Sequence, residues 1–282
     1  GAYYAAFGDR IFEDFEDRVL NKGIRSAIVK RAVFLPHNWF RLGSSKFDMG
    51  DLAERYYAEE IFDNVRYQDL VTRGERPFVI INATDMTLAA PFAFTQDQFD
   101  LLYSDLGSLP ISKAVAASAA YPCFLAGIVL RNYECRPDFT PPGWVAVSLR
   151  DREANLRRWQ RARQASTYTR GGERPYVHLL DGGVVDNLGL EPVLWALSST
   201  DCPWSVREML NEGRVKHVVV VVANAIVRAP RPWDRHEDRP TMGEMLTASV
   251  GCAQDNKSLE SLARLNEVCG GLSKEFAAPG VD

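Results

Sequence analysis

The residues best suited to chemistry lie in one turn-like segment, Asp181 to Leu190. An apolar run with the composition of a strand, Tyr176 to Leu180, precedes this segment, and an apolar, helix-like run follows it. A carboxylate at the end of a strand lies where α/β proteins keep reactive groups. Gly182 and Gly183 can adopt positive φ and let another backbone or a ligand come close, so we interpret them as residues that shape the turn. Asp181 is therefore the strongest catalytic candidate in the chain.

The same segment also has a purely structural interpretation. Asp before Gly is common in turns, and Asp181 would then cap the helix that begins near Leu188. Asp186 and Asn187 are best interpreted as N-cap residues of that helix. A metal pair of Asp181 and Asp186 is disfavoured because no third ligand lies nearby in the sequence. His178 precedes Asp181 by three residues, and this odd spacing on a strand predicts opposite faces, which argues against a His–Asp relay.

Serine and cysteine offer no second site. The 282 residues contain no Gly-x-Ser-x-Gly pattern. Ser44 and Ser45 follow a glycine but do not complete it, and Ser118 is predicted to be a packing residue. The five cysteines lie far apart with no C-x-x-C pair, which argues against a zinc site. Cys123 and Cys135 would be able to pair in an oxidising compartment, but their spacing alone does not decide it.

Two segments suggest contact with a lipid surface. The stretch 150–170 contains seven arginines against Asp151 and Glu153, a local charge of +5 in a chain of net charge −4. It is interpreted either as a solvated surface helix or as a patch that attracts anionic lipid headgroups. The aromatic loop around Trp39 and Phe40 is interpreted either as an interfacial element or as ordinary core packing.

The composition is that of an ordinary globular protein. The apolar fraction is 46% and the charged fraction 25%, and 282 residues fit one large domain or two small ones. A net charge of −4 gives no case for nucleic acid. The longest apolar stretch, Val218 to Val227, is interrupted by Asn224 and is predicted to be a buried strand, so no transmembrane segment is predicted.

Residue patterns predict helices that alternate with strands. Helices are expected at 2–20, 51–62, 111–120 and 249–268, and a short helix or strand at 25–34. Strands are expected at 77–83, 92–94, 124–130, 176–180 and 215–222. This alternation indicates an α/β layer fold with a mostly parallel sheet. Residues 136–172, rich in proline at first and then in charge, are predicted to be a surface insertion.

Several motifs in order resemble the patatin-like phospholipase family, in its bacterial-type branch. The strand followed by Asp-Gly-Gly-x-x-Asp-Asn is similar to the family's catalytic aspartate turn. The small-residue helix "PISKAVAASAAYP", the segment Asn82-Ala83-Thr84-Asp85 and the stretch "FTQDQFDLLYSDL" are similar to further family segments. Ala2-Tyr3-Tyr4 resembles the helix that leaves the nucleophile turn, and the resemblance covers roughly residues 1–227.

The resemblance implies a serine lipid acyl hydrolase that uses a Ser-Asp dyad without a cofactor or metal. Asp181 would be the general base, and Gly182 and Gly183 would support its turn. The substrate would be a phospholipid or another lipid ester, with peripheral membrane contact and no nucleic acid as partner. The fold would be a three-layer sandwich with a central, mostly parallel sheet flanked by helices. A membrane-associated location, such as a bacterial cell envelope, is favoured over the cytoplasm.

The chain departs from the family in one respect. It contains neither the nucleophile serine in its Gly-x-Ser-x-Gly turn nor the Gly-rich oxyanion loop. We expect 1–282 to be a single patatin-like domain that lacks its N-terminal strand, oxyanion loop and nucleophile turn. The intact parent would then be the enzyme, and this chain alone would be inactive. The alternative is a non-catalytic lipid- or protein-binding module that keeps the fold; a nucleotide-binding protein is disfavoured because no G-x-G-x-x-G or P-loop occurs.

Overall fold

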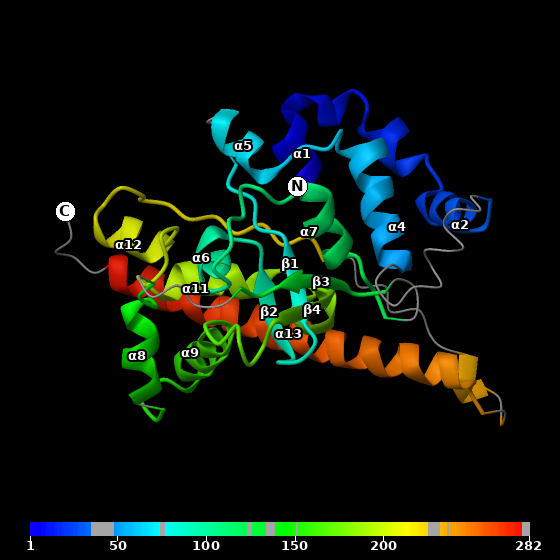
Figure 1. Cartoon of the computed structure of the whole chain (residues 1–282). Coiled ribbons are helices and arrows are strands. Elements are labelled where there is room, and N and C mark those ends of the chain that lie inside the picture. The colour runs from blue at the N-terminus through cyan, green and yellow to red at the C-terminus, as the bar shows by residue number, and fades with distance from the viewer. Residues whose placement is uncertain are drawn as a thin grey trace. The chain divides into compact units, whose positions relative to one another are not determined.

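Two compact units make up the chain, Gly1–Gly182 and Gly183–Asp282, called unit 1 and unit 2 below. Most of their helices and strands are labelled in Figure 1. The computed structural model describes residues 1–34, 48–73, 77–122, 126–133, 139–150, 152–224, 232–235, 237 and 239–277. The single domain expected from the sequence stays a prediction.

Unit 1 is a mixed α/β structure around a four-stranded sheet with the order β2-β1-β4-β3. Its strands are β1 (Asn82–Asp85), β2 (Ala90–Ala93), β3 (Ile128–Arg131) and β4 (Tyr176–Asp181). All three neighbouring pairs are antiparallel. The mostly parallel sheet predicted from the sequence is therefore not what the described residues form.

The connections explain this difference. β1 and β2 are joined by a short turn in which Asp85 accepts the N–H groups of Thr87 and Leu88 at 3.0 and 3.1 Å, and such a hairpin forces antiparallel pairing. Two helices, not one, lie between β3 and β4. A single helix carries the chain across the sheet to a parallel strand, whereas a helix pair returns it to the end from which it came.

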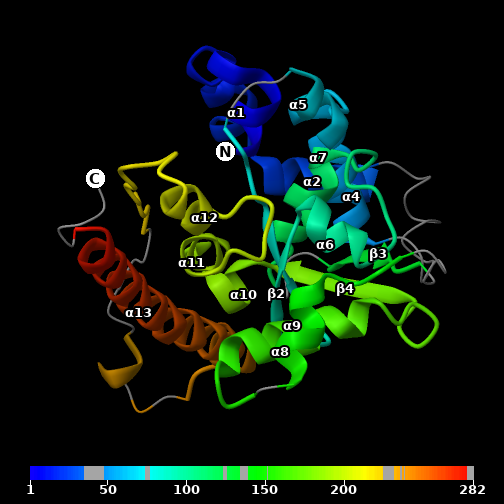
Figure 2. The same cartoon turned by 90° about the vertical axis from the view of Figure 1, so that its left-hand side faces the viewer.

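Helices cover both faces of this sheet. Figures 1 and 2 both show α4 and α7 on one side of it and α8 and α9 on the other. The helices of unit 1 are α1 (Ala2–Phe7), η1 (Gly8–Phe12), η2 (Glu16–Leu20), α2 (Ile24–Phe34), α4 (Met49–Tyr56), η3 (Tyr57–Ile61), α5 (Tyr67–Arg73), α6 (Gln96–Asp100), α7 (Ile111–Ser118), α8 (Gly143–Arg150) and α9 (Leu156–Tyr168).

Local sequence sets where several of these helices begin and end. Gly8 has φ +61°, which ends α1 because this conformation favours glycine. A capping box starts α4: the Asp48 side chain accepts the N–H groups of Gly50 and Asp51, while the Asp51 side chain accepts that of Asp48. The predicted helices at 2–20, 51–62 and 111–120 are confirmed within one or two residues, apart from the break in the first. Residues 25–34, for which the sequence left a helix or a strand open, form the helix α2.

Residues 136–172, the expected surface insertion, contain α8 and α9. Ala162, Ala165 and Tyr168 of α9 are buried in the core of unit 1. The aromatic rings of Phe92 and Tyr168 meet edge-on, with centroids 6.0 Å apart. The segment therefore has an inner face that belongs to the core as well as an outer face toward solvent.

Unit 2 is helical in the part that the structure describes. Its elements are α10 (Gly183–Asp186), α11 (Leu190–Ser198), α12 (Val206–Asn211), η4 (Pro232–Arg235) and α13 (Met242–Phe276). Its core is small, with Leu190, Leu194 and Leu197 of α11 against Leu265 of α13. The helix predicted at 249–268 is confirmed, and it extends further at both ends.

Two predicted strands are wrong in position or kind. Residues 77–81 are not in a strand, and β1 begins only at Asn82. The valine-rich run at 215–222 pairs with no strand among the described residues. Val220 and Val222 pack against the core of unit 2, but Val219 and Val221, which alternate with them, are 84% and 87% exposed. The run thus shows the alternation of a strand, although none of the described strands lies beside it.

No helix in the described ranges is long and apolar enough to cross a membrane.

Candidate active site

Asp181 is the last residue of β4, where the sequence predicted a strand-end carboxylate. It lies opposite Ala83 of β1 in the antiparallel register, and its side chain is half-buried. The core residues Val177 and Leu179 share its face of β4, because side chains alternate along a strand. The carboxylate therefore lies on the core face of β4, at the end of the strand, where it is partly exposed.

The main chain of Asp181 is held from two directions. Its N–H donates to the carbonyl oxygen of Ala120, just after α7, at 3.1 Å. Its carbonyl oxygen accepts a hydrogen bond from the Thr84 hydroxyl of β1 at 2.8 Å. Because both peptide groups are fixed, the direction in which the side chain leaves the backbone is fixed as well. Such preorganisation is what a catalytic group requires.

Gly182 lets the strand end approach β1 closely. A Cβ atom at this position would lie 2.5 Å from the carbonyl oxygen of Asn82 and 2.9 Å from its carbonyl carbon. Both are backbone atoms, so no side chain fits unless the strands move. Gly183, the second glycine of the motif, is the first residue of α10. The interpretation of Gly182 as a shape residue agrees with this geometry.

The N-cap residue of α11 is Gly189, not Asp186 or Asn187 as predicted, but the Asp186 side chain still caps the helix. Its carboxylate accepts the N–H groups of Leu190 and Glu191, the first two residues of α11, at 3.0 and 2.8 Å. Burial raises the pKa of Asp186, although these two backbone hydrogen bonds act to lower it. Asn187 does not share this role: its side-chain amide lies 3.5 Å from the Ser258 hydroxyl of α13. Only Asp186 caps the helix.

The histidines give no support for a His-based relay. His178 is exposed on β4, opposite Val129 of β3, while its neighbours Val177 and Leu179 are buried. Since the faces alternate, His178 and Asp181 point to opposite sides, as predicted. His37 and His236 lie outside the described residues.

The described residues test the metal and disulfide predictions only in part. In the part of the chain that the structure describes, no group of three His, Cys, Asp or Glu side chains is placed to hold a metal ion. Cys202, Cys252 and Cys269 are not in a disulfide bond. The possible pair of Cys123 and Cys135, the aromatic loop with Trp39 and Phe40, and Ser44 with Ser45 lie outside the described residues.

A buried polar cluster on β1 was missed by the sequence analysis. Asp85 is fully buried, and its Oδ2 accepts hydrogen bonds from the Tyr168 hydroxyl at 2.7 Å and from the Arg174 guanidinium. Its Oδ1 accepts the two N–H groups of the β1–β2 turn. Burial and the nearby Asp85 carboxylate raise the pKa of Tyr168 well above its usual value. With four donors around it, Asp85 is an anchor for α9 and not a base.

Comparison of the chain with family models, with curated proteins and with solved structures found no match. Its function is therefore inferred from its own residues.

Proposed function

We propose that the intact protein is a serine lipid acyl hydrolase of the patatin-like kind, with Asp181 as general base of a Ser-Asp dyad. The substrate would be a phospholipid or a related lipid ester. The observation that supports this best is the end of β4: a half-buried carboxylate whose peptide groups are both hydrogen-bonded, followed by a glycine pressed against β1. The motif resemblance supplies the reaction.

The reaction would proceed in two steps, acylation of the serine and hydrolysis of the acyl-serine. As the serine Oγ bonds to the ester carbonyl carbon, its proton passes to the Asp181 carboxylate, and the departing alcohol then takes that proton. Water next attacks the acyl-serine, gives a proton to Asp181 and releases the acid, and the proton returns to the serine.

The proposal requires a nucleophile and oxyanion donors that the 282 residues do not contain in the expected pattern. The Gly-x-Ser-x-Gly serine and the Gly-rich loop would have to be supplied by further residues of the parent protein. The sheet in the described residues is antiparallel, so the parallel central sheet of a patatin-like sandwich is part of this proposal as well.

The test uses the protein expressed from its complete reading frame, with Asp181→Asn as the variant. We expect kcat/KM for hydrolysis of a phospholipid and of a soluble p-nitrophenyl ester to fall about 10²- to 10⁴-fold, the usual contribution of a general base. Asp9→Asn, the same change at an exposed position of η1, should leave both rates unchanged. The purified 282-residue chain should hydrolyse neither ester. Hydrolysis that survives Asp181→Asn would overturn the mechanism.

A non-catalytic lipid- or protein-binding module is the second candidate. It is favoured by the lack of any elbow serine in these 282 residues. The residues encoded upstream of Gly1 separate the two candidates: a Gly-x-Ser-x-Gly motif there supports the enzyme. A complete reading frame without it, together with lipid binding but no ester hydrolysis, supports the module.

A further inference from the structure

The outer face of α8 is apolar. Val147 is 61% exposed and Leu149 39% exposed, and Ala146 beside them is exposed as well. Ser148, which comes just before Leu149, is buried instead, and its hydroxyl donates to the carbonyl oxygen of Trp144 one turn earlier. A solvated helix would show the reverse arrangement, with its polar side chain outside.

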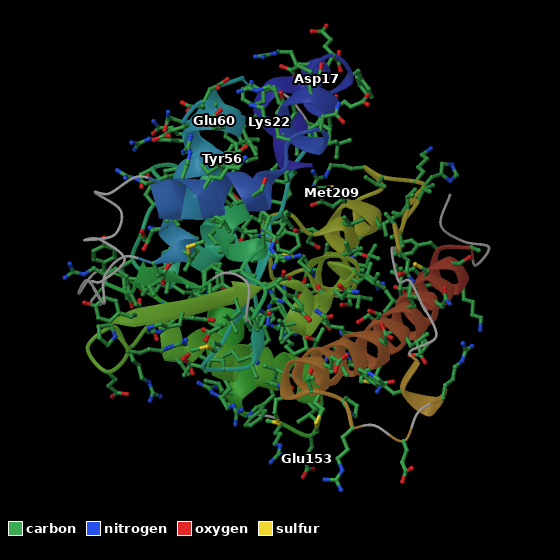
Figure 3. All side chains as sticks on the ribbon, turned by 90° about the vertical axis from the view of Figure 1, so that its right-hand side faces the viewer. Asp17, Lys22, Tyr56, Glu60, Glu153 and Met209 are labelled. Atoms are coloured by element: carbon green, nitrogen blue, oxygen red, sulfur yellow. The ribbon has the colours of Figure 1, made fainter. Side chains whose placement is uncertain are left out.

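Exposed arginines follow this apolar face along the chain. Arg150 ends α8, and Arg152 follows in the turn that leads to α9; both are exposed. α9 begins with Leu156, which is 54% exposed, and Arg157 beside it is exposed too. Figure 3 shows Glu153, the one acidic residue described in this turn, with its side chain pointing away from the ribbon.

Trp159 of α9 makes cation–π contacts with Arg152 and Arg163. The guanidinium carbon of Arg152 is 5.0 Å from the centre of a Trp159 ring, and that of Arg163 is 5.2 Å away. Cation–π contacts of this kind hold guanidinium groups beside an amphipathic ring. Tryptophan with arginine is a typical combination at the boundary between water and lipid headgroups.

The α8–α9 hairpin is held firmly on the sheet. The inner face of α9 is buried through Ala162, Ala165 and Tyr168, and the Tyr168 hydroxyl donates to Asp85 of β1. The Asn132 side chain, just after β3, donates to the carbonyl oxygen of Tyr168 at 2.8 Å. The outer face of the hairpin is therefore presented in a fixed orientation relative to the sheet of unit 1.

We propose that the outer face of the α8–α9 hairpin binds the surface of a bilayer that contains anionic lipids. Val147, Leu149 and Leu156 would enter the boundary between headgroups and acyl chains, and the arginines would contact lipid phosphates and carboxylates. A lipid surface fits both features at once. Nucleic acid would use the arginines but gain nothing from the exposed valine and leucines.

The charge distribution distinguishes this segment from the rest of the chain. The chain has a net charge of −4 and residues 150–170 carry +5, so the rest of the chain carries −9. An anionic bilayer therefore attracts the hairpin more strongly than other parts of the chain. This inference does not depend on the proposed hydrolase, because membrane binding requires neither the serine nor Asp181.

The test measures co-sedimentation of the 282-residue chain with vesicles of phosphatidylcholine, with and without phosphatidylserine. We expect binding to the phosphatidylserine vesicles only, and weaker binding at higher ionic strength. Arg150→Gln/Arg152→Gln should weaken it about 10- to 30-fold, from the contribution of each basic residue near a charged surface. The matched control is Arg55→Gln/Arg131→Gln, which removes the same charge from exposed positions elsewhere in unit 1 and should bind normally.

A second pair of variants tests the apolar face. Val147→Ser/Leu149→Ser should weaken binding several-fold, whereas Val29→Ser/Leu20→Ser, at exposed positions of α2 and η2, should not. Circular dichroism and thermal unfolding confirm that each variant is folded. Equal binding to neutral vesicles, full binding by the Arg150/Arg152 variant, or binding of duplex DNA or RNA in place of vesicles would overturn the proposal. Asp181→Asn should bind vesicles normally, so failure here and failure of the hydrolase mechanism are distinguishable.

Discussion

At the scale of single residues, three aspartates in or near the motif lie in different surroundings. Asp85 is fully buried and accepts four hydrogen bonds, so it anchors the turn, Tyr168 and Arg174. Asp186 accepts two backbone N–H groups and caps α11. Asp181 is half-buried at the end of β4, and the peptide groups on both sides of it are hydrogen-bonded. We propose Asp181 as the catalytic residue because of this fixed position and the motif around it.

Asp186 should make stability depend on pH in the acid range. Burial raises its pKa in the folded chain above the ordinary value of 3.8. Between that value and the raised one, the folded state binds the proton more tightly than the unfolded chain, so stability falls as pH rises through this window. Asp186→Asn carries no charge and should remove this part of the pH dependence. Urea unfolding at a series of pH values measures it.

Controls for this prediction separate charge from capping. Asp9→Asn, at an exposed position, should keep the pH dependence of the unaltered chain. Asp186→Ala also removes this titration and, in addition, both hydrogen bonds to α11, so it should be less stable than Asp186→Asn by about 1–2 kcal/mol at every pH. If Asp186→Asn retains the full pH dependence, another group is responsible for it.

At the scale of elements, Gly182 determines how closely the end of β4 approaches β1. Gly182→Ala would place a Cβ atom 2.5 Å from the Asn82 carbonyl oxygen, so the two strands would have to separate. We expect a loss of stability of about 1–3 kcal/mol, as for other overpacked sites, measured by urea unfolding. Gly172→Ala is the matched control, because a Cβ atom there meets nothing within 4 Å, and it should change stability by less than about 0.5 kcal/mol. Equal effects at the two positions would contradict the role of Gly182.

Helices were easier to predict than the sheet because their signals are local. The small residues at 111–120 and the apolar spacing at 51–62 reflect contacts within a few positions, and α7 and α4 formed there. Strand pairing is set by distant residues. The run at 215–222 has strong strand composition, yet no strand in the described residues lies beside it. Composition indicates what a segment is able to form, but its partner decides what it does form.

In the candidate site, too, the features with local signals were predicted and those formed by distant residues were not. Asp181 at a strand end, Gly182 in its turn and Asp186 as a helix cap follow from short motifs, and their positions were predicted. The cluster of Asp85, Tyr168 and Arg174 was not predicted, because its members lie 83 and 89 positions apart from Asp85. No local pattern links residues at such a distance. Such clusters become visible only when the fold brings β1 and α9 together.

At the scale of the whole molecule, the two units differ in how much core they contain. The core of unit 1 includes the aromatic residues Phe92, Phe94, Phe99 and Tyr168 as well as Ala83 of β1 and Val177 and Leu179 of β4. That of unit 2 has four buried leucines. Because stability comes mostly from buried apolar surface, unit 1 should be the more stable unit.

This difference should appear in amide hydrogen exchange. We expect the amides of β1 and β4 to exchange most slowly. The amides of α13 should exchange at different rates in the two halves of the helix. Near its start, Met242 is 80% exposed and Met245 is exposed too, whereas Leu265 is in the core of unit 2. A helical segment without packing is only marginally stable in water, so residues 242–256 should exchange well before 257–276. Mass spectrometry of peptides after timed exchange measures this, and uniform protection along α13 would contradict the prediction.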